Sequence, residues 1–346
     1  MDAPVAISVI VVFHNAETTI ERTLRSLAGQ RFDRAEYLFV DDASIDRTAE
    51  IIRDFMALNP DLSGRHRLIT APMKRGVACG TSEGIANSRG IYVMRCDADD
   101  YLASDALRRL WDASDHGEYD AVFAHYVREK GDRSAEVAFR RIPATLNDMP
   151  LDTLHFSMCN KILRRSILAD NGIDLYAGVD CWEDLGLVSR FMLTGPKVKY
   201  LREPVYHYVA APRGTTLSTS ANDRLLREHL MMALLVEQWF VEHSADSAYE
   251  EFLTRLKFIA KVRYLRGRDK DVARWKETFP EVNSRIMSLR HVRWYWRLLF
   301  CAVAILPTGI TQWVADRCDA FHRRPKATPS VVRPDASHPN MPEKRQ

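Results

Sequence analysis

The chain of 346 residues is long enough for one large domain with an appendage, or for two modest domains, and its 46% hydrophobic and 27% charged residues are ordinary for a soluble globular protein. A formal net charge of +3 gives no reason to expect a nucleic-acid partner. The cysteines are scattered, without zinc-type spacing, so we expect reduced thiols of a cytoplasmic protein and no disulfide framework.

The first half of the chain alternates apolar runs with helical patterns. Residues 5–13 (VAISVIVVF) form a near-continuous apolar run, typical of a strand buried on both faces and too short to span a bilayer. Further strands are predicted over 36–40, 67–71 and 91–96. Helices are predicted over 17–27, after an N-cap at Asp46, over 77–88, and after a cap at Ser104. This rhythm predicts an α/β fold with a mainly parallel sheet.

The second half changes character twice. Strands are predicted over 119–127, 198–201 and 205–208, and helices over 225–241, 249–265 and 292–318. We therefore expect an α/β domain over 1–220, divided into halves 1–117 and 118–220, and a helical region over 221–322. Residues 323–346 are rich in proline, serine and charge, which predicts a disordered tail.

Acidic residues follow two of the predicted strands. In open parallel sheets ligands bind beyond the carboxyl ends of the strands. Asp97 and Asp99 would point to the same side of an extended chain and suit Mg²⁺ or Mn²⁺ bound to a diphosphate. Asp42 lies one crossover away and could accept from a base or a ribose. Acidic turns that merely cap the next helix remain the alternative for both places.

The order and spacing of these segments resemble family 2 glycosyltransferases. Residues 7–15 (ISVIVVFHN), 20–30 (IERTLRSLAGQ) and 37–48 (YLFVDDASIDRT) resemble the opening of that family, and 86–100 (ANSRGIYVMRCDADD) resembles its later acidic stretch. The resemblance covers roughly the first 105 residues and is more specific than any one motif.

The resemblance implies the GT-A fold, a Rossmann-like sheet with helices on both faces, here followed by a C-terminal helical region. It implies that Val12 lies against the base of a nucleoside-diphosphate sugar and that Asp42 hydrogen-bonds this base. Asp97 would lie near the ribose and donor sugar, and Asp99 would bind a divalent metal, Mn²⁺ or Mg²⁺. UDP is the expected nucleotide by family habit.

The second half carries further similar motifs. Residues 159–165 (CNKILRR) resemble an element that would place Asn160 and Lys161 near the acceptor or donor sugar. Trp182-Glu183-Asp184 resembles the family's acidic motif, in which the Asp is the general base of inverting transfer; Asp184 is our candidate, Glu183 the fallback, and Trp182 a sugar contact. Acids at a helix start also compensate the helix dipole, which is the alternative.

Two more groups could contact the diphosphate. Residues 203–208 (EPVYHY) and 213–216 (RGTT) resemble a segment in which His207, also a metal candidate, and Arg213 would meet the diphosphate. Thr81-Ser82 replaces the Arg-Asn that the family usually has, so Lys74 or Arg75 would have to supply a missing cation.

The helical end has two interpretations. Residues 290–315 combine arginines, early aromatic residues and an apolar run broken at Pro307. Such a segment suits a helix lying in a bilayer interface, at the inner face of the cell membrane, or a helix packed on the catalytic domain.

The sequence therefore predicts an inverting glycosyltransferase of the bacterial cell-surface polysaccharide type. It would move a sugar from a nucleoside-diphosphate donor to a hydroxyl of a glycan or lipid-linked acceptor. A sugar nucleotidyltransferase is the runner-up, but it would want a Gly-rich loop where His14-Asn15-Ala16-Glu17 stands. A non-catalytic nucleotide-sugar-binding or scaffold protein of the same fold is the other alternative.

Overall fold

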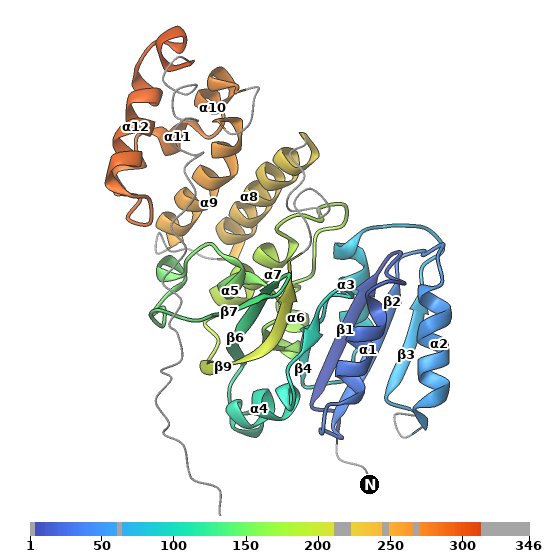
Figure 1. Cartoon of the computed structure of the whole chain (residues 1–346). Coiled ribbons are helices and arrows are strands. Elements are labelled where there is room, and N and C mark those ends of the chain that lie inside the picture. Colours follow the sequence, from blue (N-terminus) through green and yellow to red (C-terminus); the bar gives the residue numbers. More distant parts are fainter. Residues whose placement is uncertain (1–3, 61–63, 211–222, 244–248, 266–269, 313–346) are drawn as a thin grey trace, which may run out of the picture.

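A computed structural model describes residues 4–60, 64–210, 223–243, 249–265 and 270–312. Its centre is a nine-stranded sheet with the order β3-β2-β1-β4-β8-β6-β9-β5, and β7 pairs with β6 (Figure 1). The strands are β1 (Ile7–Phe13), β2 (Ala35–Asp41), β3 (His66–Thr70), β4 (Tyr92–Arg95), β5 (Tyr101–Leu102), β6 (Ala121–Lys130), β7 (Arg133–Val137), β8 (Lys161–Arg164) and β9 (Val198–Val209).

The first four strands are parallel, as their apolar runs predict. β8 joins β4 antiparallel and begins the second half of the sheet, in which β6 and β9 are again parallel. The strands predicted over 198–201 and 205–208 are one strand, β9, whose pairing with β6 shifts register between Ala124 and Tyr126. This mixed sheet confirms the expected fold class.

Helices cover both faces of the sheet. The chain moves outward from β1 to β3 and then returns to β4, so right-handed crossovers put α1 (Ile20–Ala28) and α2 (Thr48–Leu58) on one face and α3 (Val77–Asn87) on the other. Gly80 lets α3 lie close to β1, because a Cβ there would be 2.5 Å from Cγ1 of Val12. The remaining helices of this domain are α4 (Ala106–Ala113), α5 (Thr153–Phe156), α6 (Arg165–Asp170) and α7 (Glu183–Leu193).

Two predicted caps lie elsewhere than expected. Asp46 precedes the N-cap of α2 and accepts from the backbone N–H of Thr48 at 3.0 Å, so the helix begins two residues later. The N-cap of α4 is Asp105 with φ of 55°, and Ser104 lies outside the helix.

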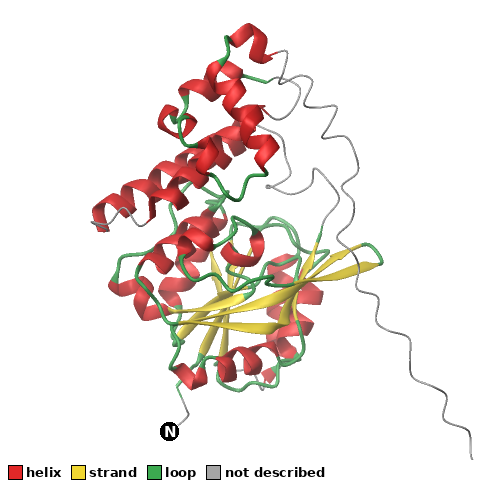
Figure 2. Ribbon diagram, turned by 90° about the vertical axis from the view of Figure 1, so that its left-hand side faces the viewer, coloured by secondary structure: helices red, strands yellow, loops and turns green. Residues whose placement is uncertain are grey.

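The C-terminal helices stack at one end of the sheet domain (Figure 2). They are α8 (Asp223–His243), α9 (Glu250–Val262), α10 (Val272–Glu277), α11 (Pro280–Asn283) and α12 (Trp294–Ile305). The helix predicted over 292–318 is interrupted: α12 ends at Ile305, because Leu306 precedes Pro307 and is extended, and residues 308–312 are helical again. In the described parts of the chain, none of the helices has the length and apolar character needed to cross a bilayer.

Two hydrophobic cores hold the molecule together. The first surrounds the sheet and includes Met232 of α8 and Phe252 of α9. The second surrounds Trp275 and joins α9 to α10, α11 and α12. The predicted boundary at residue 220 and the predicted tail over 323–346 lie outside the described residues, so these predictions stand as made.

Candidate active site

A cavity of about 1110 Å³ opens at the carboxyl ends of β1 and β4. Its position is the one expected for ligand binding in an open α/β sheet, and its volume is slightly above the usual range of about 300–1,000 Å³ for small-molecule sites. The side chains that line it include Val12, Arg95, Asp97, Asp99, Asn160, Trp182, Glu183 and Asp184. The two acidic motifs of the sequence therefore face one cavity.

The turn after β4 is fixed by a buried tyrosine. The hydroxyl of Tyr206 lies 3.1 Å from the backbone N–H of Asp97 and donates to the Asp100 carboxylate at 2.7 Å. The backbone N–H of Val209 donates to the other oxygen of Asp100. Asp100 thus ties the turn to β9 and leaves Asp97 and Asp99 to face the cavity.

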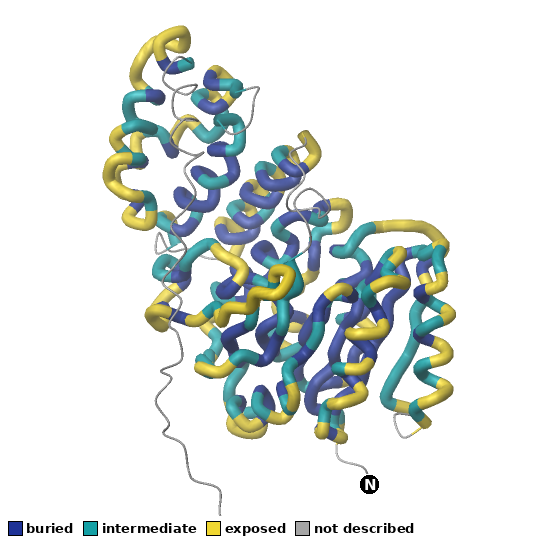
Figure 3. The backbone as a smooth tube through the Cα atoms, viewed as in Figure 1, coloured by how far each residue is buried: buried dark blue, intermediate teal, exposed yellow. Residues whose placement is uncertain are grey.

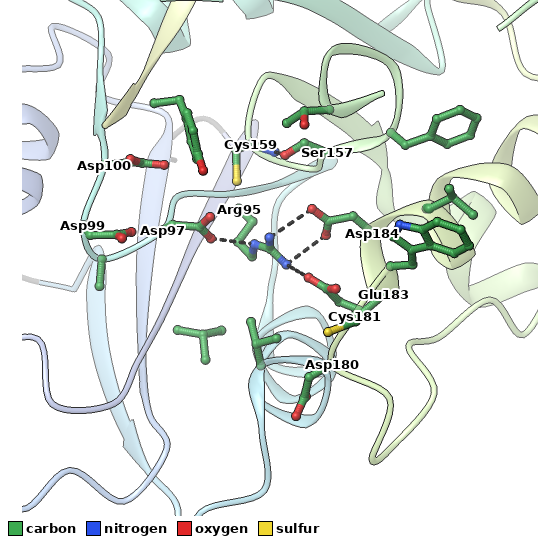
Figure 4. A pocket seen from close by; sticks show the side chains of 18 of the residues that line it. Arg95, Asp97, Asp99, Asp100, Ser157, Cys159, Asp180, Cys181, Glu183 and Asp184 are labelled. Atoms are coloured by element: carbon green, nitrogen blue, oxygen red, sulfur yellow. Dashed lines mark hydrogen bonds and ion pairs between the residues drawn. The ribbon is translucent and has the colours of Figure 1, made fainter. Parts of the chain in front are cut away.

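Arg95 links the two acidic motifs (Figure 4). Its guanidinium lies between Asp97 on one side and Glu183 and Asp184 on the other. Nε is 2.9 Å from Oδ1 of Asp97, Nη1 is 2.9 Å from Oε1 of Glu183 and 2.8 Å from Oδ1 of Asp184, and Nη2 donates to Oδ2 of Asp184 at 2.9 Å. One buried cation therefore contacts three carboxylates.

Burial and mutual repulsion raise the pKa of Glu183, Asp184 and Asp99. Burial raises the pKa of Glu183, and the charge of Asp184 raises it further. Burial also raises the pKa of Asp184, although Arg95 opposes that shift. Burial and the charge of Asp97 raise the pKa of Asp99. Burial lowers the pKa of Arg95, but Asp184 and Asp97 together hold it well above its ordinary value. The cluster has more acids than cations, so it would gain from a second cation.

Helix α8 holds the segment that leads into α7. Oε2 of Glu228 accepts from the backbone N–H groups of Asp180, at 3.0 Å, and Cys181, at 2.9 Å. Trp182 has φ of 65° and stacks on His229 with ring centroids 3.8 Å apart. The residues that precede the candidate base are thus positioned by a helix that lies outside the sheet domain in sequence.

Four of the predicted site residues do not line this cavity. The Asp42 carboxylate accepts from the backbone N–H groups of Arg75 (2.7 Å) and Gly76 (2.9 Å), so it holds the loop before α3 instead of facing a base. Lys74 on that loop is exposed and lies outside the cavity. The loop before α3 is bound to the Asp42 carboxylate after β2, and this contact turns Asp42 toward the loop and leaves Lys74 on its exposed side.

His207 and Lys161 point away because side chains alternate along a strand. Tyr206 and Tyr208 line the cavity, whereas His207 stacks on Tyr101, with centroids 4.3 Å apart, and lies 2.9 Å from Glu129. Lys161 is fully buried, and its Nζ donates to the Ser157 carbonyl and to Oδ1 of Asn160.

Two more predicted contacts need qualification. Asn160 lines the cavity, but its Nδ2 already donates to the carbonyls of Ala124 (2.6 Å) and Leu154 (3.0 Å). The amide nitrogen is therefore engaged in hydrogen bonds that connect parts of the backbone. Arg213 lies outside the described residues. Val12, Asp97, Asp99, Trp182, Glu183 and Asp184 all line the cavity, and their roles stay predictions.

Arg95 is the site residue that the sequence analysis missed.

Within the described residues no three His, Cys, Asp or Glu side chains form a group able to hold a metal alone. Asp97 and Asp99 nevertheless fit a hard cation, because both present oxygen ligands to the cavity and such a cation often takes only one or two carboxylates beside substrate phosphates.

Comparisons with known proteins point to a family of glycosyltransferases. Residues 8–172 match the family model described as Glycosyl transferase family 2. The putative glycosyltransferase EpsH of Bacillus subtilis strain 168 is 25% identical over 221 residues, which are 60% of this chain and 61% of that protein. The poly(ribitol-phosphate) beta-N-acetylglucosaminyltransferase TarS of Staphylococcus aureus strain Mu50 is 26% identical over 255 residues, 72% of this chain and 44% of that protein.

The fold is also that of a solved relative. The crystal structure of S. aureus TarS residues 1–349 in complex with UDP matches with a TM-score of 0.68 and 18% identity, over 91% of this chain and 92% of that one. The matches with EpsH and full-length TarS span less than two thirds of either protein's length. Residues 8–172 are thus similar to glycosyl transferase family 2, and the described chain shares the fold of TarS residues 1–349.

Proposed function

We propose that the chain is an inverting glycosyltransferase that moves a sugar from a nucleoside-diphosphate donor, UDP-linked by preference, to an acceptor hydroxyl. The observation that carries the proposal is that Asp97, Asp99, Glu183 and Asp184 line one cavity and that Asp97 and Asp184 contact the same guanidinium. Both ends of a displacement reaction therefore fit within the reach of one bound sugar.

The donor side of the cavity is the turn after β4. Asp97 and Asp99 would hold Mn²⁺ or Mg²⁺ together with the diphosphate oxygens, and Val12 would lie against the nucleotide. When bound, the cation supplies neutralisation of the negative charge that develops on the leaving diphosphate. Burial and the charge of Asp97 raise the pKa of Asp99, and a bound cation would oppose that shift.

The acceptor side is the start of α7. Asp184 takes the proton from the attacking acceptor hydroxyl, and Glu183 is the alternative base. Burial raises the pKa of both carboxyls, which brings them nearer to the range in which a base can work at neutral pH. Arg95 fixes the direction of the Asp184 carboxylate through contacts to both of its oxygens.

The acceptor that we propose is a glycan or lipid-linked glycan of a bacterial cell surface, and the setting is cytoplasmic. The acceptor in the names of TarS and of a beta-glucosyltransferase of Bacillus spizizenii is poly(ribitol-phosphate), a polymer with free hydroxyl groups. The described cysteines are free thiols, which fits a reducing compartment.

The turn after β1 disfavours the nucleotidyltransferase alternative. It is pinned to the loop after β2: the backbone N–H of Asn15 donates to Oγ of Ser44 at 3.1 Å, and the N–H of Ile45 donates to Oδ1 of Asn15 at 2.9 Å. These amides are engaged within the protein instead of forming a phosphate-gripping loop.

Release of UDP from a panel of UDP-sugars, with Mn²⁺ or Mg²⁺ and a cell-wall glycan acceptor, tests the proposal. Asp184→Asn should lower kcat by about 10²–10⁴-fold, and Asp99→Asn should raise the metal concentration needed for half-maximal rate. Asp54→Asn, on the exposed side of α2, is the matched control and should behave as the wild type. Equal turnover in all four proteins would refute the site.

A further inference from the structure

Helix α12 presents an outer face made of aromatic and aliphatic side chains. Trp294, Tyr295, Leu298 and Ile305, which we call the outer stripe, are 65%, 42%, 50% and 82% exposed. At about 100° per residue they fall, with Ala302, on one arc about 100° wide. The opposite side of the helix, through Phe300 and Val303, packs on the core around Trp275. Among the described residues, the outer stripe therefore remains exposed to solvent when the opposite side of α12 is packed on the core.

This apolar face is bordered by positive charge. The sequence from 282 to 315 contains no aspartate or glutamate, while it contains Arg285, Arg290, Arg293 and Arg297. Arg285 is paired with Glu250, and Arg290 is exposed but lines a second cavity beside Asp148 and Glu251. Arg293 is exposed at the N-cap of α12, directly before the outer stripe. Arg293 donates to the hydroxyl of Tyr295 at 2.9 Å, which places cation and aromatic ring together.

We infer that the outer stripe of α12 docks on a lipid surface that carries anionic headgroups. Apolar side chains would enter the acyl boundary, aromatic rings would lie at the headgroup level, and the arginines would meet lipid phosphates. The helix lies in the interface and does not cross it, because its 12 residues extend about 18 Å against a hydrocarbon core of about 30 Å.

A second copy of the chain is the less favourable occupant. A symmetric contact would bring the same patch of each copy together, so the arginines would face arginines. An anionic bilayer instead offers the opposite charge. Figure 3 shows the exposed outer side of α12, and Figure 1 shows this helix at the end of the molecule remote from β1 and β4. Docking there leaves the cavity open to its substrates.

Flotation of the full chain with vesicles tests the inference. The protein should float with phosphatidylcholine vesicles that contain phosphatidylglycerol, and added salt should release it. The variant Trp294→Ser/Leu298→Ser/Ile305→Ser should bind these vesicles at least about tenfold more weakly, and Arg290→Gln/Arg293→Gln should also bind more weakly. Leu58→Ser/Val241→Ser is the matched control, since these side chains are 80% and 72% exposed on other helices, and it should bind as the wild type.

Three outcomes would overturn the inference. The first is failure of the wild type to float with anionic vesicles at low salt. The second is equal binding by the outer-stripe variant, with a wild-type melting temperature showing that it is folded. The third is that light scattering shows a dimer for the wild type and a monomer for the outer-stripe variant, while neither protein binds vesicles. None of these measurements depends on glycosyl transfer.

Discussion

Arg95 ends a strand whose other residues, Tyr92, Val93 and Met94, are fully buried, and it is itself 5% exposed. A guanidinium in such a place needs partners, and it finds three carboxylates from two motifs 86 residues or more apart. The residue acts on the proposed chemistry through Asp184, so it is a positioning residue.

Changing Arg95 should separate this role from a purely structural one. Arg95→Lys cannot contact both oxygens of Asp184 in one plane, so we expect kcat to fall about 10–100-fold with little change in the KM for the donor. Loss of the planar cation should also raise the pKa of Asp184, which Arg95 now lowers, and shift the acid limb of the kcat–pH profile to higher pH. Steady-state kinetics across pH measures both.

Arg164→Lys provides the control for Arg95→Lys. Arg164 also pairs with a carboxylate, donating from Nε to Asp120 at 2.7 Å, but neither residue lines the cavity. It should leave the kcat–pH profile unchanged. If both variants lower kcat and leave the acid limb in place, Arg95 has a structural role only.

For single residues, the sequence predicted correctly which side chains line the cavity where the motif determines both the residue type and the direction of the side chain. Asp97 and Asp99 lie in the turn after β4 and Asp184 lies in the first turn of α7, and all three line the cavity. It failed for His207 and Lys161, where the strand register decides which side of the sheet a side chain faces. It also failed for Asp42, whose partners Arg75 and Gly76 come from a loop more than 30 residues away.

Helix α8 contributes to the active site through contacts with a segment that is distant in sequence. Its apolar spacing predicted the helix, but spacing does not say which polar residues it carries to the active site. Glu228 is 7% exposed and binds two backbone N–H groups of the segment before α7. These contacts join α8 to residues 47 and 48 positions away, which no local pattern reveals.

Glu228→Gln should loosen the segment that carries the proposed base. The amide keeps the shape but weakens two charge-assisted hydrogen bonds, at a cost of about 2 kcal/mol in the free energy of unfolding. We expect a lower melting temperature and a fall in kcat/KM of about tenfold, measured by calorimetry and UDP release. Glu242→Gln, at an exposed position of the same helix, should change neither. A wild-type kcat/KM in Glu228→Gln would show that α8 does not position Asp184.

The whole molecule rests on two cores that share α9. Phe252 and Leu256 pack in the core of the sheet, whereas Phe258 and Val262 pack around Trp275. The sequence predicted helices in this region but not their division, because apolar spacing marks the buried face of a helix and not what covers it. The second core carries α12, and so the proposed lipid-binding face depends on it.

Trp275→Ala should therefore unfold the end of the molecule and spare the sheet. Trp275 is fully buried, with the Phe300 ring centroid at 6.1 Å and Nζ of Lys261 at 4.5 Å, so its truncation should cost about 3–5 kcal/mol. Hydrogen exchange should show lost protection in α10 to α12, while the amides of β1 and β4 keep theirs. Phe39→Ala, a truncation of equal depth in the sheet core, should lower protection in β1 and β4. Loss of protection in β1 after Trp275→Ala would mean that both cores unfold as one unit. In that case α12 could not unfold while the active site stays folded.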